Sequence, residues 1–186
     1  MFGLVTPGLS VLTLRPAVLR REWLDGNITR YPESHYLDLV VDGRSFSAIA
    51  HGPANMVAPL NRAWLPTVPD AIRELLGERP TEGLSEGRTS LLVCGTCGDL
   101  AYGAVTVSLR VVDDTVTWSK FAWENAYEPA TRIDGAPASV AFDRRDYADV
   151  LTNAYGRIAE FPYDELAHRG RKFLWPWQWG WRLPKS

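Results

Sequence analysis

The sequence predicts an α+β fold: a mainly antiparallel sheet built from β-hairpins, with one short helix, one longer helix and a tryptophan-rich C-terminal arm. Residues 36–49 and 101–123 each contain two strand-like stretches divided by a two-residue turn, which is typical of a β-hairpin. Residues 67–77 and 144–158 carry apolar side chains at helical spacing. Because strands and helices do not alternate along the chain, we do not expect a doubly wound parallel sheet.

Length and composition predict one domain over residues 1–167, followed by a basic arm over residues 168–186. The 186 residues suffice for one sizeable core. With 20 basic and 22 acidic residues the net charge is -2, so we expect no nucleic-acid partner, which would need clustered Lys and Arg. The sequence contains neither a secretory signal nor a run of roughly 20 apolar residues. We therefore predict a cytoplasmic protein without a membrane span.

The first strands are predicted near the N-terminus. Residues 9–14 alternate well enough to form a strand, and Pro16 argues against a long central one. A hairpin follows at Asp42-Gly43, because this pair tolerates the positive φ angles of a type I′ turn. The resulting register gives the hairpin an apolar face, with the pairs Leu39 and Phe46, and Leu37 and Ala48.

A short helix is predicted to begin at Thr67, where Asp70 resembles the second member of a capping box. Gly77 and Pro80 end this helix. Its buried stripe consists of Ile72, Leu75 and Leu76.

Two other segments are expected to be irregular. Residues 52–66 contain several prolines, and Trp64 and Leu65 are expected to pack onto the domain. Residues 82–88 are rich in glycine and charge, which predicts a surface loop.

The second hairpin has the clearest pattern. Residues 101–112 and 115–123 flank a tight turn at Asp113-Asp114. Arg110 and Thr117 are expected on one face of this hairpin. The other face belongs to the core and carries the pairs Val111 and Val116, and Leu109 and Trp118.

The longer helix is predicted over residues 144–158. Asp143 is expected to cap it and Asp146 to lie in its first turn, while Phe161-Pro162 closes it. Its buried stripe consists of Tyr147, Val150, Leu151, Ala154 and Ile158.

Both cysteines of the chain lie in one run, Cys94-Gly-Thr-Cys97-Gly-Asp-Leu-Ala-Tyr102-Gly-Ala. Residues 91–93 are expected to form a short buried strand that leads into it, so the CxxC pair is predicted in a turn between strands. Two cysteines cannot supply the disulfide network of a small secreted domain. In a reducing compartment a CxxC pair is more often a metal or redox element.

Residues 91–107, with the strand motif Asp114-Thr-Val-Thr-Trp118, resemble a group of bacterial proteins, common in actinobacteria, that share a CPxCGDLGCGA block and a DxVxW strand. The Asp42-Gly43 hairpin and the helix end at Gly77 fit the same layout. No activity is established for this group, so the resemblance implies a fold and a bacterial source rather than a function. Tyr102 stands where these relatives often carry a third cysteine, so a ligand or redox role of that cysteine would be lost here.

A structural zinc site is one hypothesis for the cysteines. Such a site needs four ligands, and the CxxC pair supplies two of them. His35 and His51 flank the open ends of the first hairpin and would lie near each other in the predicted register. Cys94, Cys97, His35 and His51 are therefore the candidate zinc ligands. The alternative is that each histidine is an ordinary surface or capping residue.

Two other interpretations of the CxxC pair stay open. A redox dithiol is one, although the pair precedes a strand and not a helix, whose N-terminus would lower a thiol pKa. The other is a structural turn in which the small cysteines pack and Gly95 and Gly98 supply positive φ angles.

No catalytic residue is predicted. The Gly-x-Ser-x-Gly, His-Glu-x-x-His and phosphate-binding Gly-x-x-x-x-Gly-Lys-Ser motifs do not occur in the sequence. The carboxylates are isolated or belong to the turn at Asp113-Asp114. The sequence therefore leans away from an enzyme without excluding one.

The arm over residues 168–186 combines five Lys or Arg residues with four alternating tryptophans: Trp175, Trp177, Trp179 and Trp181. In an extended chain all four indoles would lie on one side and form an apolar stripe that water disfavours. These tryptophans are the candidate partner-binding residues. The arm is expected to dock on its own domain, on a protein partner or on a second copy of the chain. Contact with a membrane surface is a further alternative, which the net acidity of the domain disfavours.

Two classes of function follow. The first is a non-catalytic protein-binding domain of a bacterium, similar in character to an immunity protein or antitoxin, and small size, mild acidity and many aromatic residues favour it. The alternative is a metal-dependent or thiol-dependent protein that uses Cys94 and Cys97. A Cys97→Ser substitution separates them, because only the second class should be sensitive to it.

Overall fold

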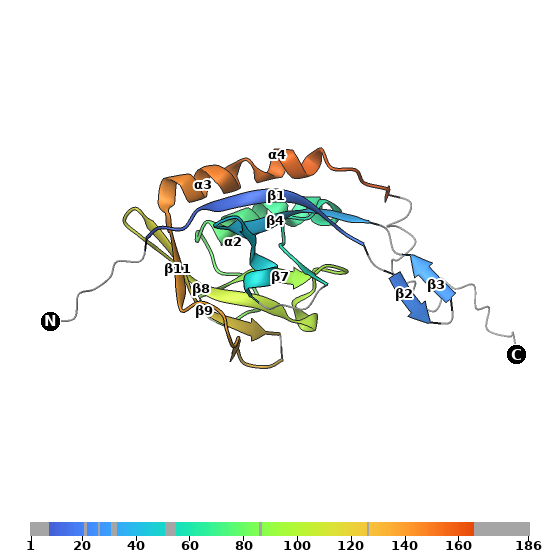
Figure 1. Cartoon of the computed structure of the whole chain (residues 1–186), viewed down its shortest axis with the longest axis horizontal. Helices are drawn as coiled ribbons and strands as arrows, with labels where there is room; N and C mark the ends of the chain where they lie inside the picture. Colours follow the sequence, from blue (N-terminus) through green and yellow to red (C-terminus); the bar gives the residue numbers. More distant parts are fainter. Residues whose placement is uncertain are drawn as a thin grey trace, which may run out of the picture.

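The computed structural model describes residues 8–20, 22–25, 27–30, 33–50, 55–85, 87–125 and 127–165. These residues form antiparallel sheets together with helices, which confirms the predicted α+β class with mainly sheet (Figure 1). The C-terminal arm lies outside the described residues, so the predictions for its tryptophans stay predictions. Among the described helices, none has both the length and the apolar character required to cross a bilayer.

The larger sheet is antiparallel and, in the described part of the chain, has six strands. Its main path runs in the order β10-β9-β8-β7-β6. Strand β11 also pairs with β9, along a part of β9 that β10 does not reach. The strands are β6 (Met56–Val57), β7 (Arg88–Cys94), β8 (Ala104–Val112), β9 (Thr115–Glu124), β10 (Thr131–Arg132) and β11 (Ser139–Asp143).

A second sheet is formed by β1 (Leu12–Leu19), β4 (Ser34–Val41) and β5 (Arg44–Ser45). Strand β1 pairs with β4 along its whole length. Pro16 lies in β1, which is an edge strand of this sheet, as expected for a residue that cannot donate a backbone hydrogen bond. The backbone of β2 (Glu22–Asp25) pairs with that of β3 (Asn27–Arg30).

The first hairpin is only partly as predicted. The turn at Asp42-Gly43 has the expected positive φ angles, but the returning strand β5 ends at Ser45 and α1 (Phe46–Ile49) follows. The expected pairs of Leu39 with Phe46 and of Leu37 with Ala48 are therefore wrong. The ring of Phe46 instead packs edge-on against Trp118 of β9, so burial against the other sheet decides its position.

The second hairpin has the predicted register. Val111 pairs with Val116, and Leu109 pairs with Trp118. The register shifts between Thr106 and Ser108, where β9 carries one extra residue. Lys120 lies in this bulge with a φ of 53°, a conformation that the hairpin signal alone does not predict.

The short helix α2 (Val68–Leu75) follows the 3-10 turn η1 (Arg62–Thr67). Its buried residues include Ile72 and Leu75, as predicted. The capping box is wrong: the Thr67 hydroxyl donates to the Trp64 carbonyl at 3.0 Å and caps no N–H of α2. A proline at the second helical position already removes one of the N–H groups that a cap would satisfy.

The predicted longer helix is divided into α3 (Arg144–Thr152) and α4 (Ala154–Ala159), which follow one another along β1 (Figure 1). Asp143 caps α3 as predicted, because its carboxylate accepts from the N–H groups of Arg145 and Asp146 at 2.9 and 3.0 Å. The helix is interrupted at Asn153, whose N–H binds the Leu151 carbonyl.

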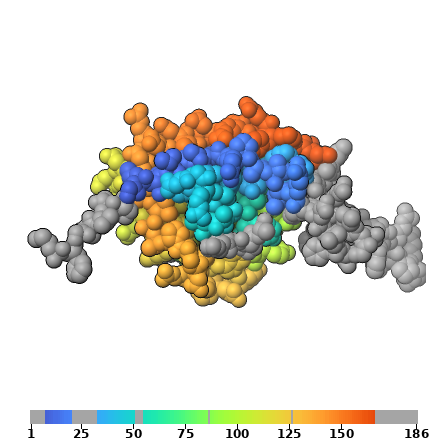
Figure 2. All heavy atoms as spheres, in the orientation of Figure 1, coloured from blue at the N-terminus to red at the C-terminus, as the bar shows by residue number. Residues whose placement is uncertain are grey.

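The core lies between the two sheets and under α2, α3 and α4. Its largest side chain is Trp118, which contacts Phe142 and Tyr147 in edge-on geometry. Figure 2 shows β1 and the helices α3 and α4 covering the upper part of one face of the molecule. The CxxC turn lies where β7 leaves this core.

Candidate functional site

The CxxC turn connects β7 to η2 (Leu100–Tyr102), so it lies between two strands of the larger sheet as predicted. The N–H of Gly98 donates to the Cys94 carbonyl at 2.8 Å and closes the turn. The N–H of Gly95 donates to the Asn55 carbonyl at 2.8 Å, next to β6. The backbone around both cysteines is therefore held at each end.

The two glycines of the turn have different roles. Gly98 has a φ of +70°, as predicted, and any Cβ there would lie 3.1 Å from the indole of Trp64. Gly95 has no positive φ, so that part of the prediction is wrong. A Cβ at Gly95 would collide with Leu19 and with the Asn55 carbonyl, so glycine is needed there because another segment approaches closely.

The two thiols differ in exposure: Cys94 is buried, whereas Cys97 is exposed. Burial by itself raises the pKa of Cys94, but hydrogen bonds from the backbone of Thr96 and Cys97 and from the Cys97 thiol outweigh it and lower that pKa below its ordinary value. Desolvation raises the pKa of Cys97, and the proximity of Cys94 raises it further. Of the two thiols, Cys94 therefore has the lower pKa. Cys97 keeps its proton and donates the hydrogen bond to the Cys94 sulfur.

A cleft of about 560 Å³ lies beside the exposed thiol, and we call it the Cys97 cleft. Trp64 lines it and packs over Gly98. Glu74 is the centre of its polar lining, because its carboxylate accepts from Thr81 at 2.7 Å and from Arg79 at 3.1 Å. Buried Nε of Arg79 has no hydrogen-bond partner among the described residues.

The predicted zinc ligands are only partly placed. Cys94 and Cys97 are close enough to share a hydrogen bond. His35 lies in β4, where it pairs with Val18 and its Nε2 lies 3.7 Å from a carboxylate oxygen of Glu33. Within the residues that the structure describes, no three His, Cys, Asp or Glu side chains form a group able to hold a metal ion. Because His51 lies outside those residues, the four-residue zinc site stays a prediction.

The expectation that Tyr102 stands in place of a third cysteine stays a prediction. Tyr102 lies at the end of η2 and is 71% exposed. This side chain therefore covers no part of the core and leaves the position open to solvent.

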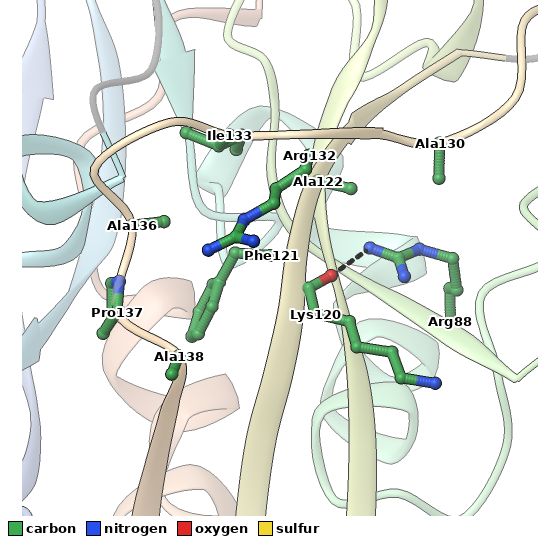
Figure 3. Close-up of a pocket in the computed structure, with 10 residues that line it drawn as sticks. All are labelled: Arg88, Lys120, Phe121, Ala122, Ala130, Arg132, Ile133, Ala136, Pro137 and Ala138. Carbon is green, nitrogen blue, oxygen red and sulfur yellow. Dashed lines mark hydrogen bonds between the residues drawn. The ribbon is translucent and has the colours of Figure 1, made fainter.

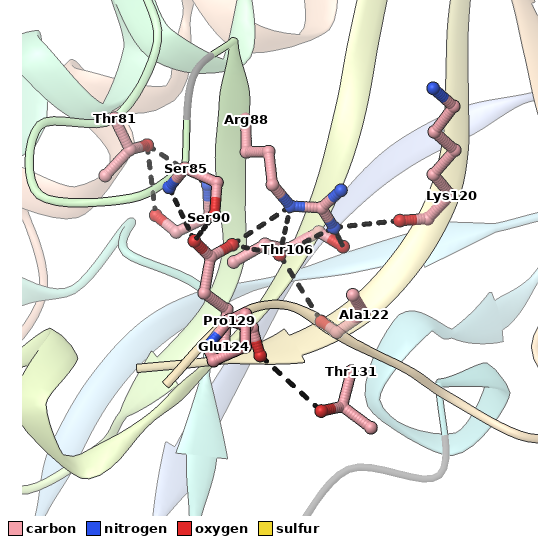
Figure 4. Close-up of polar contacts among 10 residues, drawn as sticks. All are labelled: Thr81, Ser85, Arg88, Ser90, Thr106, Lys120, Ala122, Glu124, Pro129 and Thr131. Atoms are coloured by element: carbon pink, nitrogen blue, oxygen red, sulfur yellow. Dashed lines mark hydrogen bonds and ion pairs between the residues drawn. The ribbon is translucent and has the colours of Figure 1, made fainter. Parts of the chain in front are cut away.

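A buried ion pair between Arg88 and Glu124 is the polar cluster that sequence reasoning missed (Figure 4). Arg88 was expected in a surface loop, but it begins β7 and only 10% of its side chain is exposed. Its Nε lies 3.0 Å from a Glu124 oxygen, and its Nη2 donates to the Thr106 and Lys120 carbonyls at 3.0 and 2.8 Å. Strands β7 and β9, which flank β8, bring the two charges together across β8, a relationship that no local pattern shows.

Hydrogen bonds hold Glu124 in its charged form. Burial would raise the pKa of this carboxyl, but the hydroxyl and N–H of Ser85, the hydroxyl of Thr106 and the charge of Arg88 outweigh burial and lower it. Burial also lowers the pKa of Arg88, against the opposing effect of Glu124. The pair is ionised at neutral pH and fixes the guanidinium in place.

No family model, no curated protein and no solved structure matches this chain. The cysteine pair, the Cys97 cleft and the buried ion pair are therefore the features that can indicate a function.

Proposed function

We propose that the protein carries out reversible thiol–disulfide chemistry with Cys94 and Cys97 in the reducing cytoplasm. The observation that carries the proposal is the hydrogen bond between a buried and an exposed thiol within one closed turn. Two sulfurs this close can be oxidised to a disulfide without bringing distant segments together. The exposed sulfur also borders the Cys97 cleft, so a reactant can reach it.

The asymmetry of the pair assigns a role to each sulfur. Cys97 is accessible, and its thiolate form, although less populated than that of Cys94, attacks one sulfur of an incoming disulfide, which forms a mixed disulfide and releases one thiolate. Cys94, whose thiolate is stabilised, then attacks the Cys97 sulfur, which forms the Cys94–Cys97 disulfide and releases the second thiolate. The protons of the two protein thiols end on the two released thiols, so the reactant is reduced as the protein is oxidised.

The Cys97 cleft supports this order of events. Trp64 offers an apolar wall next to Gly98, while Glu74 and Arg79 contribute opposite charges to the same lining. A reactant with both apolar and polar parts fits such a lining. Cys94 does not line this cleft, so a reactant in the cleft meets Cys97 first and Cys94 acts only in the second step.

The proposal is tested by equilibrating the reduced protein with glutathione disulfide and counting thiols by alkylation and mass spectrometry. We expect both thiols to disappear together, without bound glutathione, and to return when a reductant is added. In Cys94→Ser we expect a stable glutathione adduct on Cys97, because no second thiol can displace it. Two thiols that stay reduced, or separate adducts on both cysteines of the native chain, would contradict the proposal. Zinc bound in one equivalent with both thiols protected would replace it with the structural zinc site.

The protein-binding role, similar to an immunity protein or antitoxin, stays a prediction. Its candidate partner-binding residues, the four tryptophans of the arm, lie outside the described residues. Tyr102 gives it one local argument, because this exposed side chain lies on the segment that directly follows Cys97. A protein partner that docks on Tyr102 would therefore contact the segment that follows the exposed thiol. The test is capture of a purified partner by Cys94→Ser protein. If adding Tyr102→Ser weakens this capture, the protein-binding role and the thiol role apply to one surface.

A further inference from the structure

We propose that a second cavity, the Arg88 pocket, binds a small organic anion whose body is apolar. The pocket has a volume of about 360 Å³ and lies over the bulge of β9, enclosed on the other side by residues 130–138 (Figure 3). This is the lower end of the size range of ligand sites. It is separate from the Cys97 cleft, since no residue lines both.

The charges at the pocket have one sign. Its lining includes Arg88, Lys120 and Arg132 and no acidic residue. Glu124 balances Arg88 from outside the lining, but Arg132 forms no ion pair with any acid in the described part of the chain. A ligand that enters the pocket therefore meets uncompensated positive charge, which favours an anion.

Arg88 supplies a fixed donor. Nine-tenths of its side chain is buried, and its Nε and Nη2 are held by Glu124, Thr106 and the Lys120 carbonyl. Its Nη1 makes no hydrogen bond within the residues that the structure describes. A guanidinium held in this way loses little conformational freedom when it donates to a carboxylate.

Arg132 supplies the second donor from the opposite wall. Figure 3 shows its guanidinium pointing toward Phe121 and Ala136, whereas the Lys120 side chain extends away from it. Arg132 lies in β10 and is exposed, so its side chain can move to meet a ligand. The N–H of Ile133 donates to the Phe121 carbonyl at 3.2 Å, which holds this wall against β9.

The remaining lining is apolar and determines the kind of anion. Phe121, Ile133 and Pro137 provide aromatic and aliphatic surface that an inorganic anion would leave uncovered. A carboxylate attached to an aromatic or aliphatic body would use both parts of the pocket. The bulge at Lys120 directs its carbonyl to Arg88 and so keeps the floor of the pocket in place.

The experiment uses benzoate as the probe, with benzyl alcohol and inorganic sulfate as matched compounds that lack the charge or the apolar body. Binding is followed by chemical-shift changes in amide NMR spectra of the full chain. We expect saturable binding of benzoate at the amides of residues 120–122 and 130–138, at least tenfold tighter than binding of either matched compound.

Two variants and one control locate the site. Arg132→Gln should weaken benzoate about tenfold, and Ala136→Leu, which fills the pocket without changing charge, should weaken it as well. Arg110→Gln removes one exposed arginine elsewhere in the larger sheet and should leave binding unchanged. Equal effects of Arg132→Gln and Arg110→Gln, equal affinity for benzoate and benzyl alcohol, equal affinity for benzoate and sulfate, or no saturation would each overturn the proposal.

Discussion

The indole Nε1 of Trp118 donates a hydrogen bond to the Tyr147 hydroxyl at 3.1 Å, and that hydroxyl donates in turn to the Leu75 carbonyl at 2.8 Å. These two bonds join β9, α3 and the last residue of α2 in the interior of the core. Burial raises the pKa of Tyr147 far above its ordinary value, although the bond from Trp118 opposes this shift. The phenol therefore stays neutral and keeps the proton that it donates to Leu75.

Tyr147→Phe should destabilise the protein by about 1–3 kcal/mol, because it leaves the Trp118 N–H and the Leu75 carbonyl buried without partners. The measurement is the free energy of unfolding in urea. Tyr155→Phe is the matched control, since Tyr155 is 44% exposed on α4. Equal losses in the two variants would show that the buried bonds contribute nothing.

Glu124→Gln should destabilise the protein at neutral pH by about 3–5 kcal/mol, because it leaves the buried charge of Arg88 without its counter-ion. The urea midpoint measures this effect. Glu160→Gln removes an exposed carboxylate and serves as the control. A loss no larger than that of the control would mean that solvent or another group already neutralises Arg88.

The stabilisation by Glu124 should also depend on pH. Its pKa is lowered in the folded protein, so its contribution is fully present above the ordinary value of 4.5 and is lost as the pH falls through the lower folded value. The difference in unfolding free energy between the native chain and Glu124→Gln should therefore shrink as the pH is lowered below about 4.5. If the difference in unfolding free energy between the two proteins stays constant or increases as the pH falls, the lowered pKa of Glu124 is contradicted.

Cys94→Ser should make Cys97 more reactive at neutral pH. Desolvation raises the pKa of Cys97 and Cys94 raises it further, so removal of Cys94 lowers this pKa and increases the thiolate fraction. The rate of alkylation by iodoacetamide, measured against pH, should have its midpoint at lower pH in the variant than in the native chain. Cys97→Ser, in which the buried Cys94 remains, should react slowly. An unchanged or higher midpoint in Cys94→Ser would show that the two thiols do not interact.

Gly103→Ala and Gly156→Ala should have opposite effects on stability. Gly103 has a φ of +95° and lies against the Trp123 ring, so a Cβ there is strained and collides with the indole. This substitution should cost at least about 1 kcal/mol. Gly156 lies in α4 with open space around its Cα, and alanine there should stabilise by about 0.5–1 kcal/mol. Thermal unfolding should show a lower Tm for Gly103→Ala and a higher Tm for Gly156→Ala. Shifts of the two Tm values in the same direction would contradict this account.

Local patterns predicted the elements that local forces determine. The β8–β9 register follows from a two-residue turn and from alternating side chains beside it, and the structure has the predicted pairs Val111–Val116 and Leu109–Trp118. The Asp143 cap depends only on the next three residues and is also as predicted. The position of the CxxC pair in a turn between strands belongs to the same group.

The sequence by itself determined the α+β class, the second hairpin, the capped start of α3 and the place of both cysteines, because turn chemistry, capping and side-chain periodicity act over a few neighbouring residues. Only the tertiary structure decided which contacts these elements make. Phe46 left the first hairpin because its ring packs on Trp118, and Arg88 became buried because β8 and β9 bring Thr106 and Glu124 to it. The difference between the buried Cys94 and the exposed Cys97 was likewise decided by the packing around the turn. Burial depends on segments that are distant in the sequence, and no local pattern contains that information.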